Sequence, residues 1–204
     1  MLDLVVSPDG HARCGWCVAH PDLVAYHDDE WGRPVTSDDR LYEKMCLEGF
    51  QAGLSWLTIL RKRDAFRSAF ADFAVDAVAA FDERDVERML GDAGIIRNRG
   101  KIEAVIANAA VVQKIQAAEG SFSAFVWGFA PAAWPAPTHL ADIPAITPES
   151  TALAKELRRR GARFVGPTTM YALMEAMGMV NDHLVGCHVR DAVENERAAS
   201  GARH

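Results

Sequence analysis

Long apolar segments, a signal sequence and an excess of basic residues are all missing from this chain. No apolar run approaches the roughly 20 residues that a membrane-spanning helix requires. The first ten residues lack the basic region and the long apolar stretch of a signal peptide, so we expect a cytoplasmic protein without membrane contact. The net charge of −6 over 204 residues provides no global basic surface, so any nucleic acid would have to contact a local patch.

Cysteine is also scarce, and the four cysteines present are irregularly spaced. In a cytoplasmic protein such spacing favours thiols and metal ligands over a disulfide framework. Cys14 and His27 near the start of the chain, and His183 and Cys187 near its end, form two candidate ligand pairs. Two cysteines and two histidines would fill a tetrahedral zinc site and leave no open position for a reactive water, so we predict structural Zn²⁺.

Cys17 leaves a second arrangement open. It forms a Cys-x-x-Cys pair with Cys14, so a site of Cys14, Cys17, His183 and Cys187, or a redox pair, also fits the spacing. Cys46 lies in an apolar helical stretch, and we expect it to be a small core residue.

The hydrophobic pattern predicts an all-α fold. Apolar residues recur at three- and four-residue spacing along nearly the whole chain, and alternating β-branched runs are almost absent. We expect an N-terminal extension over residues 1–12, a single domain of two helical lobes with a pocket between them over 13–190, and a flexible tail over 191–204. His204, in that tail, is not expected to be a ligand.

A Gly166-Pro167 turn joins two predicted helices, 150–160 and 170–177. Backbone N–H groups at the start of the second helix are free to hold a phosphate, which makes this segment a helix-hairpin-helix candidate. Three basic clusters lie beside turns or helix ends, as expected of a protein that contacts a sugar-phosphate backbone. They are Arg61 to Arg63; Arg97, Arg99 and Lys101; and Arg158 to Arg160 with Arg163.

Aromatic residues and one carboxylate, Glu48 in a stretch with few other charges, form a further candidate constellation. Trp16, Tyr26 and Trp31 lie near the first two ligand candidates, and Trp56 follows Glu48 along the chain. A carboxylate in apolar surroundings needs a partner, because burying it unpaired is costly, and a cationic or amine-bearing ligand would supply one. The alternative is that Glu48 caps a helix break at Gly49.

With these residues identified, the chain resembles the 3-methyladenine DNA glycosylase I family of the helix-hairpin-helix DNA glycosylase superfamily. The matching segments extend from Arg13 to Cys187, nearly the whole chain. They are Arg13-Cys14-Gly15-Trp16, residues 25–32, 46–56 and 92–97, Phe164-Val165-Gly166, and Val180-Asn181-Asp182-His183. The resemblance implies a helix-hairpin-helix glycosylase fold with zinc held by Cys14, His27, His183 and Cys187, which selects His27 over Cys17.

The resemblance also implies a monofunctional enzyme of base excision repair. Its reaction is hydrolysis of the N-glycosidic bond of 3-methyladenine in double-stranded alkylated DNA by base flipping, leaving an abasic site. Glu48 and Tyr26 are then the catalytic residues, and they line a base pocket with Trp16, Trp31 and Trp56. We place Gly53 and Leu54 in the gap left by the flipped nucleotide. The DNA backbone would lie against Gly166, Thr168 and Thr169, and we expect a monomer without a nucleotide cofactor.

This chain departs from the family's pattern at several positions. Leu23 stands where some relatives have a second tyrosine, and Phe50-Gln51 replaces a common glutamine pair. Asp182 lies near the position of an aspartate that related enzymes use to stabilise the sugar cation, but we expect it to orient His183 instead. Two rival hypotheses are a DNA-binding module without catalysis and a zinc hydrolase.

Overall fold

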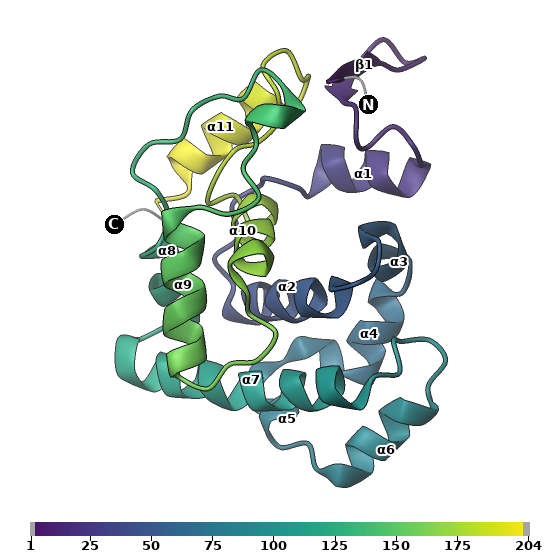
Figure 1. The fold of residues 1–204 in the computed structure, drawn as a ribbon, viewed down its shortest axis with the longest axis vertical. Coiled ribbons are helices and arrows are strands. Elements are labelled where there is room, and N and C mark those ends of the chain that lie inside the picture. The colour runs from purple at the N-terminus through teal and green to yellow at the C-terminus, as the bar shows by residue number, and fades with distance from the viewer. Residues whose placement is uncertain (1–2, 202–204) are drawn as a thin grey trace.

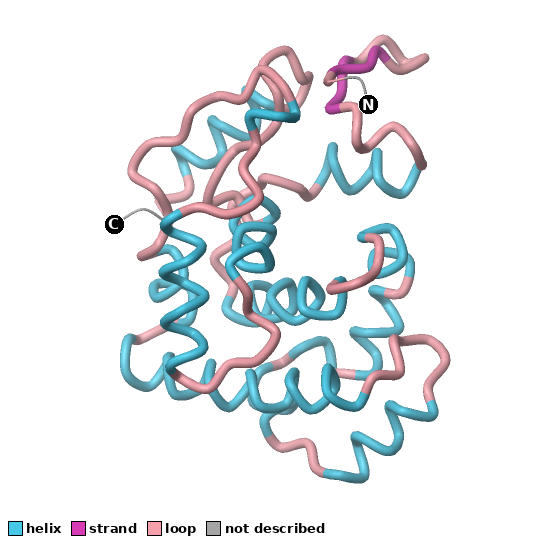
Figure 2. The backbone as a smooth tube through the Cα atoms, viewed as in Figure 1, coloured by secondary structure: helices cyan, strands magenta, loops and turns pink. Residues whose placement is uncertain are grey.

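The structure, a computed structural model, describes residues 3–201 and is mostly helical (Figure 1). Helices and loops alternate along the chain, and the strands are confined to its first residues (Figure 2). No helix within residues 3–201 has the length and apolar character to cross a membrane. The helices are α1 (Pro21–Asp29), α2 (Asp38–Gln51), α3 (Trp56–Arg61), α4 (Arg63–Ala69), α5 (Val75–Ala79), α6 (Glu83–Gly91), α7 (Arg99–Glu119), α8 (Phe122–Trp127), α9 (Pro148–Arg159), α10 (Pro167–Ala176) and α11 (Arg190–Ala199), with short 3₁₀ turns at Ala71–Phe73 and Leu140–Asp142.

A short hairpin corrects the all-α prediction. Strands β1 (Leu4–Val6) and β2 (Ala12–Cys14) pair antiparallel, with Leu4 opposite Cys14. The turn between them closes through a hydrogen bond from the Gly10 N–H to the Ser7 carbonyl, and Gly10 adopts a φ of +85° that favours glycine. Three-residue strands are too short to show the alternation by which sequence analysis detects them.

Helix α2 forms the centre of the core. Every residue from Leu41 to Phe50 is buried, and the helix packs against α3, α7, α8 and α10. In Figure 1 it lies between α1 on one side and α7 on the other. Its start follows from Ser37, whose hydroxyl accepts a hydrogen bond from the Arg40 N–H and so caps the helix.

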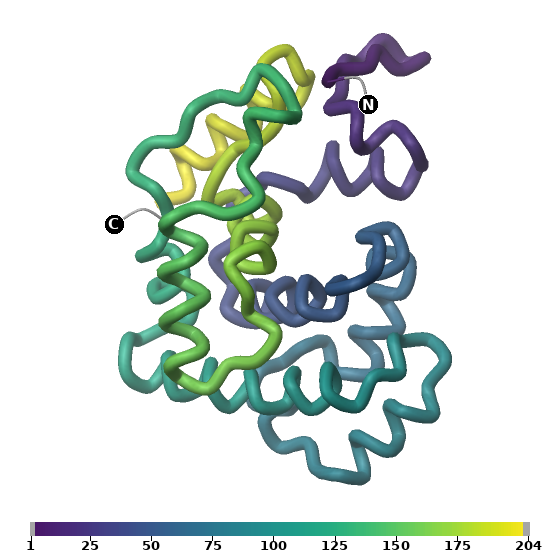
Figure 3. The backbone as a smooth tube through the Cα atoms, in the orientation of Figure 1, coloured from purple at the N-terminus to yellow at the C-terminus, as the bar shows by residue number. Residues whose placement is uncertain are grey.

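The two ends of the chain lie together. Figure 3 shows the N-terminal hairpin beside the loop that precedes α11. The His188 N–H donates to the Ala12 carbonyl at 2.9 Å, and Cys14 packs with Leu184, Cys187 and Val189 in a small separate core. Residues from both termini therefore form one cluster.

Helix α11 corrects the prediction of a flexible tail. Val193 is fully buried, and the buried guanidinium of Arg197 donates to the carbonyls of Gly178 and Met179 at 2.7 and 2.9 Å. The polar composition hid this helix because its contacts are made largely by a charged side chain that bonds backbone carbonyls. Residues 202–204, including His204, lie outside the described residues.

Candidate functional site

A recess of about 240 Å³ brings together all five residues predicted for the base pocket: Trp16, Tyr26, Trp31, Glu48 and Trp56. Its volume is just below the roughly 300 Å³ at which pockets for drug-sized ligands begin, so it suits a smaller molecule. Helices α2 and α10, which pack against each other, both contribute lining residues, while Tyr26 comes from α1 and Trp56 begins α3. The sequence analysis missed the other lining residues, which are Lys44, Gln51, Ile143, Ala172, Glu175 and Ala176.

Glu48 is buried, with 7% of its surface exposed, and it borders the recess. Its Oε1 lies 2.6 Å from Nζ of Lys44, one helical turn earlier on α2. The partner that the sequence analysis required is thus a side chain of the same helix. A capping role at Gly49 is wrong, because α2 continues without a break to Gln51.

Lys44 makes two further contacts through its ammonium group. Nζ donates a hydrogen bond to the Tyr26 hydroxyl at 2.9 Å, and it lies 3.3 Å from the centroid of the Trp56 ring. Desolvation lowers the pKa of Lys44, and the attraction of Glu48 opposes this shift. The only sequence signal for this residue was its spacing of four from Glu48 on a predicted helix.

The aromatic side chains form the remaining walls. The ring centroids of Tyr26 and Trp56 are 5.2 Å apart, and Trp16 packs edge-on against Trp31 at 5.1 Å. Desolvation raises the pKa of Tyr26 well above its usual value, so its hydroxyl stays protonated at neutral pH. The indole N–H of Trp56 is a buried donor without a hydrogen-bond partner within residues 3–201. A ligand with an acceptor atom would satisfy it.

A second carboxylate lines the recess from α10. Burial and the neighbouring Asp182 raise the pKa of Glu175 well above its ordinary value. Asp182 accepts hydrogen bonds from the Trp134 indole at 2.7 Å and the Tyr171 hydroxyl at 2.5 Å. Both of its oxygens are thereby engaged away from the metal ligands, which corrects the prediction that Asp182 orients His183.

A groove of about 250 Å³ continues from the recess. It shares Glu48, Gln51 and Ala172 with the recess, and four of the five residues predicted to contact DNA line it: Gly53, Leu54, Thr168 and Thr169. Leu54 is 41% exposed, so its apolar side chain is accessible at this groove. Gly166, the fifth, is the N-cap residue of α10 next to this groove.

Most basic residues of the three predicted clusters are paired within the chain. Arg63 forms two hydrogen bonds with Glu30 at 2.6 and 2.7 Å, and Lys101 donates to the carbonyls of Phe50 and Ala52 at the end of α2. Acidic neighbours also bind Arg61, Arg99, Arg159, Arg160 and Arg163. Arg97 and Arg158 are exposed and have no such partner in the described part of the chain.

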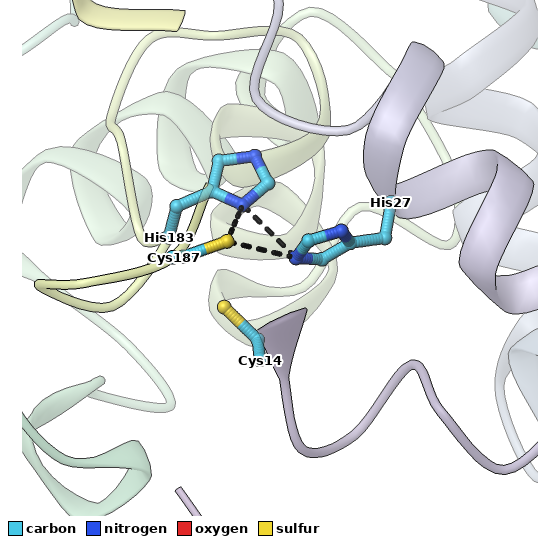
Figure 4. Close-up of side chains that lie close together, drawn as sticks. All are labelled: Cys14, His27, His183 and Cys187. Atoms are coloured by element: carbon cyan, nitrogen blue, oxygen red, sulfur yellow. Dashed lines mark hydrogen bonds between the residues drawn. The ribbon is translucent and has the colours of Figure 1, made fainter. Parts of the chain in front are cut away.

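The four predicted metal ligands form one buried group (Figure 4). Nδ1 of His183 lies 3.1 Å from Nε2 of His27, and Sγ of Cys187 lies 3.5 Å from the same nitrogen. The ligand atoms of Cys14, His27, His183 and Cys187 are all within 4.8 Å of one another. A tetrahedral ion bound to two sulfurs and two nitrogens would space these atoms about 3.3–3.8 Å apart. The donor set and its dimensions fit a metal ion, and Cys17 does not belong to the group.

The outer contacts of this group orient both imidazoles. Nδ1 of His27 bonds Asp28 at 2.7 Å, and Asp28 in turn accepts hydrogen bonds from Arg13. Nε2 of His183 bonds the Trp31 carbonyl at 3.0 Å, which turns Nδ1 toward the other ligands. A hydrogen bond from Cys14 lowers the pKa of Cys187, and the same contact raises the pKa of Cys14.

Comparison with known proteins shows which family the whole chain is similar to. The profile of the methyladenine glycosylase family matches residues 16–191. DNA-3-methyladenine glycosylase 1 of Escherichia coli (strain K12) is 50% identical over 178 residues, which cover 86% of this chain and 95% of that protein.

Solved structures agree with the sequence comparison. The crystal structure of a 3-methyladenine DNA glycosylase I matches with a TM-score of 0.83 at 48% identity, covering 86% of this chain and 98% of that one. A tyrosine-to-phenylalanine variant of such an enzyme, solved in complex with 3-methyladenine, matches with a TM-score of 0.83 at 34% identity, covering 87% and 97%.

Proposed function

The chain belongs to the methyladenine glycosylase family, and we propose that it hydrolyses the N-glycosidic bond of 3-methyladenine in alkylated DNA. The products are the free base and an abasic site with both strands intact. The observation that carries this proposal is the buried carboxylate of Glu48 at the edge of a recess walled by three tryptophans and a tyrosine.

The chemistry of the substrate explains why such a recess suffices. Methylation at N3 gives the purine a positive charge while it is still attached to the sugar, so it is already a good leaving group. The protein then needs to hold the flipped base and to exclude undamaged bases, more than to protonate the leaving group. Water attacks the anomeric carbon as the bond to the base breaks.

We expect the lining residues to recognise both the positive charge and the planar shape of the alkylated base. Glu48 attracts the cationic ring through its carboxylate, and the faces of Trp56 and Trp16 stack on a planar cation. The protonated hydroxyl of Tyr26 can donate to a ring nitrogen, and the free indole N–H of Trp56 can donate to another acceptor. Glu48 and Tyr26 are accordingly our candidates for the catalytic residues, with Trp31 as a supporting wall.

The groove beside the recess is our candidate for the DNA contact. Helices α9 and α10 pack together across the turn that contains Gly166, and we interpret this unit as the helix-hairpin-helix. Backbone N–H groups at the start of α10 would hold a phosphate, with Thr168, Thr169 and the exposed Arg158 beside it. Exposed Leu54 on the adjacent Gly53 turn would fill the space left by the flipped base in double-stranded DNA.

The group of two cysteines and two histidines would hold Zn²⁺ in a structural role. All four positions of a tetrahedral ion would be filled by protein, so no water is activated there. The ion would join the N-terminal hairpin to the segment before α11, and it would stabilise the wall that Tyr26 and Trp31 give to the recess. We further expect a cytoplasmic monomer whose residues 13–190 act as one glycosylase domain.

The direct test is product release from DNA treated with a methylating agent. The purified protein should release 3-methyladenine, identified by chromatography, and should leave the strands intact until alkali cleaves the abasic sites. Binding of the methylated DNA without release would favour a binding module over an enzyme. A zinc hydrolase would instead lose turnover on chelation while remaining folded.

A further inference from the structure

Lys44 occupies the position that a cationic ligand of the recess would need. Its Nζ is 2.6 Å from the Glu48 carboxylate and 3.3 Å from the Trp56 ring centroid, and it is 5.1 Å from the Tyr26 ring centroid. Carboxylate, indole face and phenol are also the groups proposed above to bind the alkylated base. Because stacked carbon atoms come no closer than about 3.5 Å, a base cannot stack on this face of Trp56 while the ammonium is there.

The ammonium is held firmly by these contacts. An ammonium group has three N–H donors, and here it has three partners in Glu48, the Tyr26 hydroxyl and the Trp56 face. The side chain is 7% exposed, so water contributes little to its solvation. Moving the ammonium away therefore breaks its ion pair with Glu48. Only another cation can form an ion pair with Glu48 in its place.

A small side cavity gives Lys44 room to move. This cavity has a volume of about 20 Å³, enough for one water, and Lys44, Tyr26 and Trp56 separate it from the recess. Its acidic residues Glu30 and Glu43 are already bound by arginines. The ammonium is thus better stabilised beside Glu48, and it would leave only when a ligand takes its place.

We propose that Lys44 is a specificity-determining residue that acts as a built-in competitor, so that a base in the recess reaches the position between Glu48 and Trp56 only by displacing the Lys44 ammonium. This inference rests on the proposed function. A cationic 3-methyladenine replaces one positive charge with another. A neutral adenine would break the ion pair and leave Glu48 without a cation, so undamaged bases are rejected even when they are flipped.

Two small ligands of similar shape test this role. The 3,9-dimethyladeninium ion carries a fixed positive charge like the base in DNA, and 9-methyladenine is neutral. In Lys44→Met, an unbranched side chain of similar size without charge, the fixed cation should bind about tenfold more tightly than in the parent protein. Binding of 9-methyladenine and slow release of adenine from undamaged DNA should also increase.

Two control variants isolate the charge. Lys44→Arg keeps a cation beside Glu48 and should show no gain in affinity, and Lys114→Met, on the exposed face of α7, should behave as the parent protein. Weaker or unchanged binding by a folded Lys44→Met would overturn the proposal, because it would mean that Lys44 supports the bound base. If the parent protein neither binds the fixed cation nor releases 3-methyladenine, the proposed function fails, and the role of Lys44 fails with it.

A structure of the unaltered protein with the fixed cation bound provides a test that does not depend on any variant folding. Nζ of Lys44 should lie beyond hydrogen-bond distance from Glu48, with the ligand between Glu48 and Trp56. A complex in which Lys44 and Glu48 remain paired beside the ligand would contradict displacement.

Discussion

Tyr26 and His27 are consecutive residues of α1, yet they serve two different sites. The Tyr26 side chain lines the recess, while Nε2 of His27 faces the other three members of the metal group. Trp31 connects the same two sites, because its side chain lines the recess and its carbonyl accepts the hydrogen bond from His183. The recess and the candidate metal group therefore share the residues that position them.

Removal of the metal should unfold the protein and abolish base release together. Without the ion, two histidines and two cysteines remain buried without the charge that holds them, and the hairpin loses its link to the segment before α11. We expect about one zinc per chain by elemental analysis, and a strong fall in the melting temperature after chelation. A metal-free protein that keeps its melting temperature and loses only turnover would point to a catalytic metal.

Replacement of Leu54 by alanine should weaken binding to methylated DNA by roughly tenfold, since an apolar wedge contributes a few kcal/mol at most. Affinity for the free base should not change, because Leu54 lines the groove and not the recess. Ile146→Ala, at another exposed apolar residue, is the matched control. Equal losses for DNA and free base would assign Leu54 to the recess wall.

The ion pair of Glu30 with Arg63 should make the free energy of unfolding depend on pH in the acidic range. Burial alone would raise the pKa of Glu30, but the hydrogen bonds from Arg63 lower it below the usual 4.5. A carboxyl group whose pKa is lower in the folded protein than in the unfolded chain stabilises the fold at pH values above its pKa in the unfolded chain. This stabilisation is lost as the pH falls through the lower pKa of the folded protein.

Glu30→Gln should therefore lower the free energy of unfolding at neutral pH, and the difference from the parent protein should shrink below about pH 4.5. Solvent screens this partly exposed pair, so we expect a difference of less than about 1 kcal/mol. Urea unfolding at both pH values measures the difference. If the difference in the free energy of unfolding between Glu30→Gln and the parent protein grew on acidification, the pKa of Glu30 would not be lowered by folding.

Much of this molecule could be predicted from local sequence. Helix periodicity predicted the mostly helical fold, and the aromatic residues together with Glu48 predicted the recess. The ligand group was predictable because a cysteine and a histidine lie close together near each end of the sequence, and the resemblance chose between His27 and Cys17.

The missed features depend on which helices meet in space. Glu175 lies in an otherwise apolar helical stretch, and nothing in that stretch indicates that it lines the same recess as Lys44 and Glu48. Lys44 was not singled out because a Lys–Glu pair at this spacing is usually a solvated face of a helix. The polar residues of α11 are likewise typical of a solvated segment, which is why the sequence predicts a flexible tail there.

The single-turnover rate of 3-methyladenine release by Glu48→Gln tests the central claim most directly. This variant keeps the shape of the side chain and removes its charge, so we expect the rate to fall at least a hundredfold while the variant stays folded and binds DNA. Glu149→Gln, on α9 outside both cavities, should release the base at the parent rate. A Glu48→Gln variant that releases 3-methyladenine at the parent rate would contradict a role for the carboxylate in recognising the charged base.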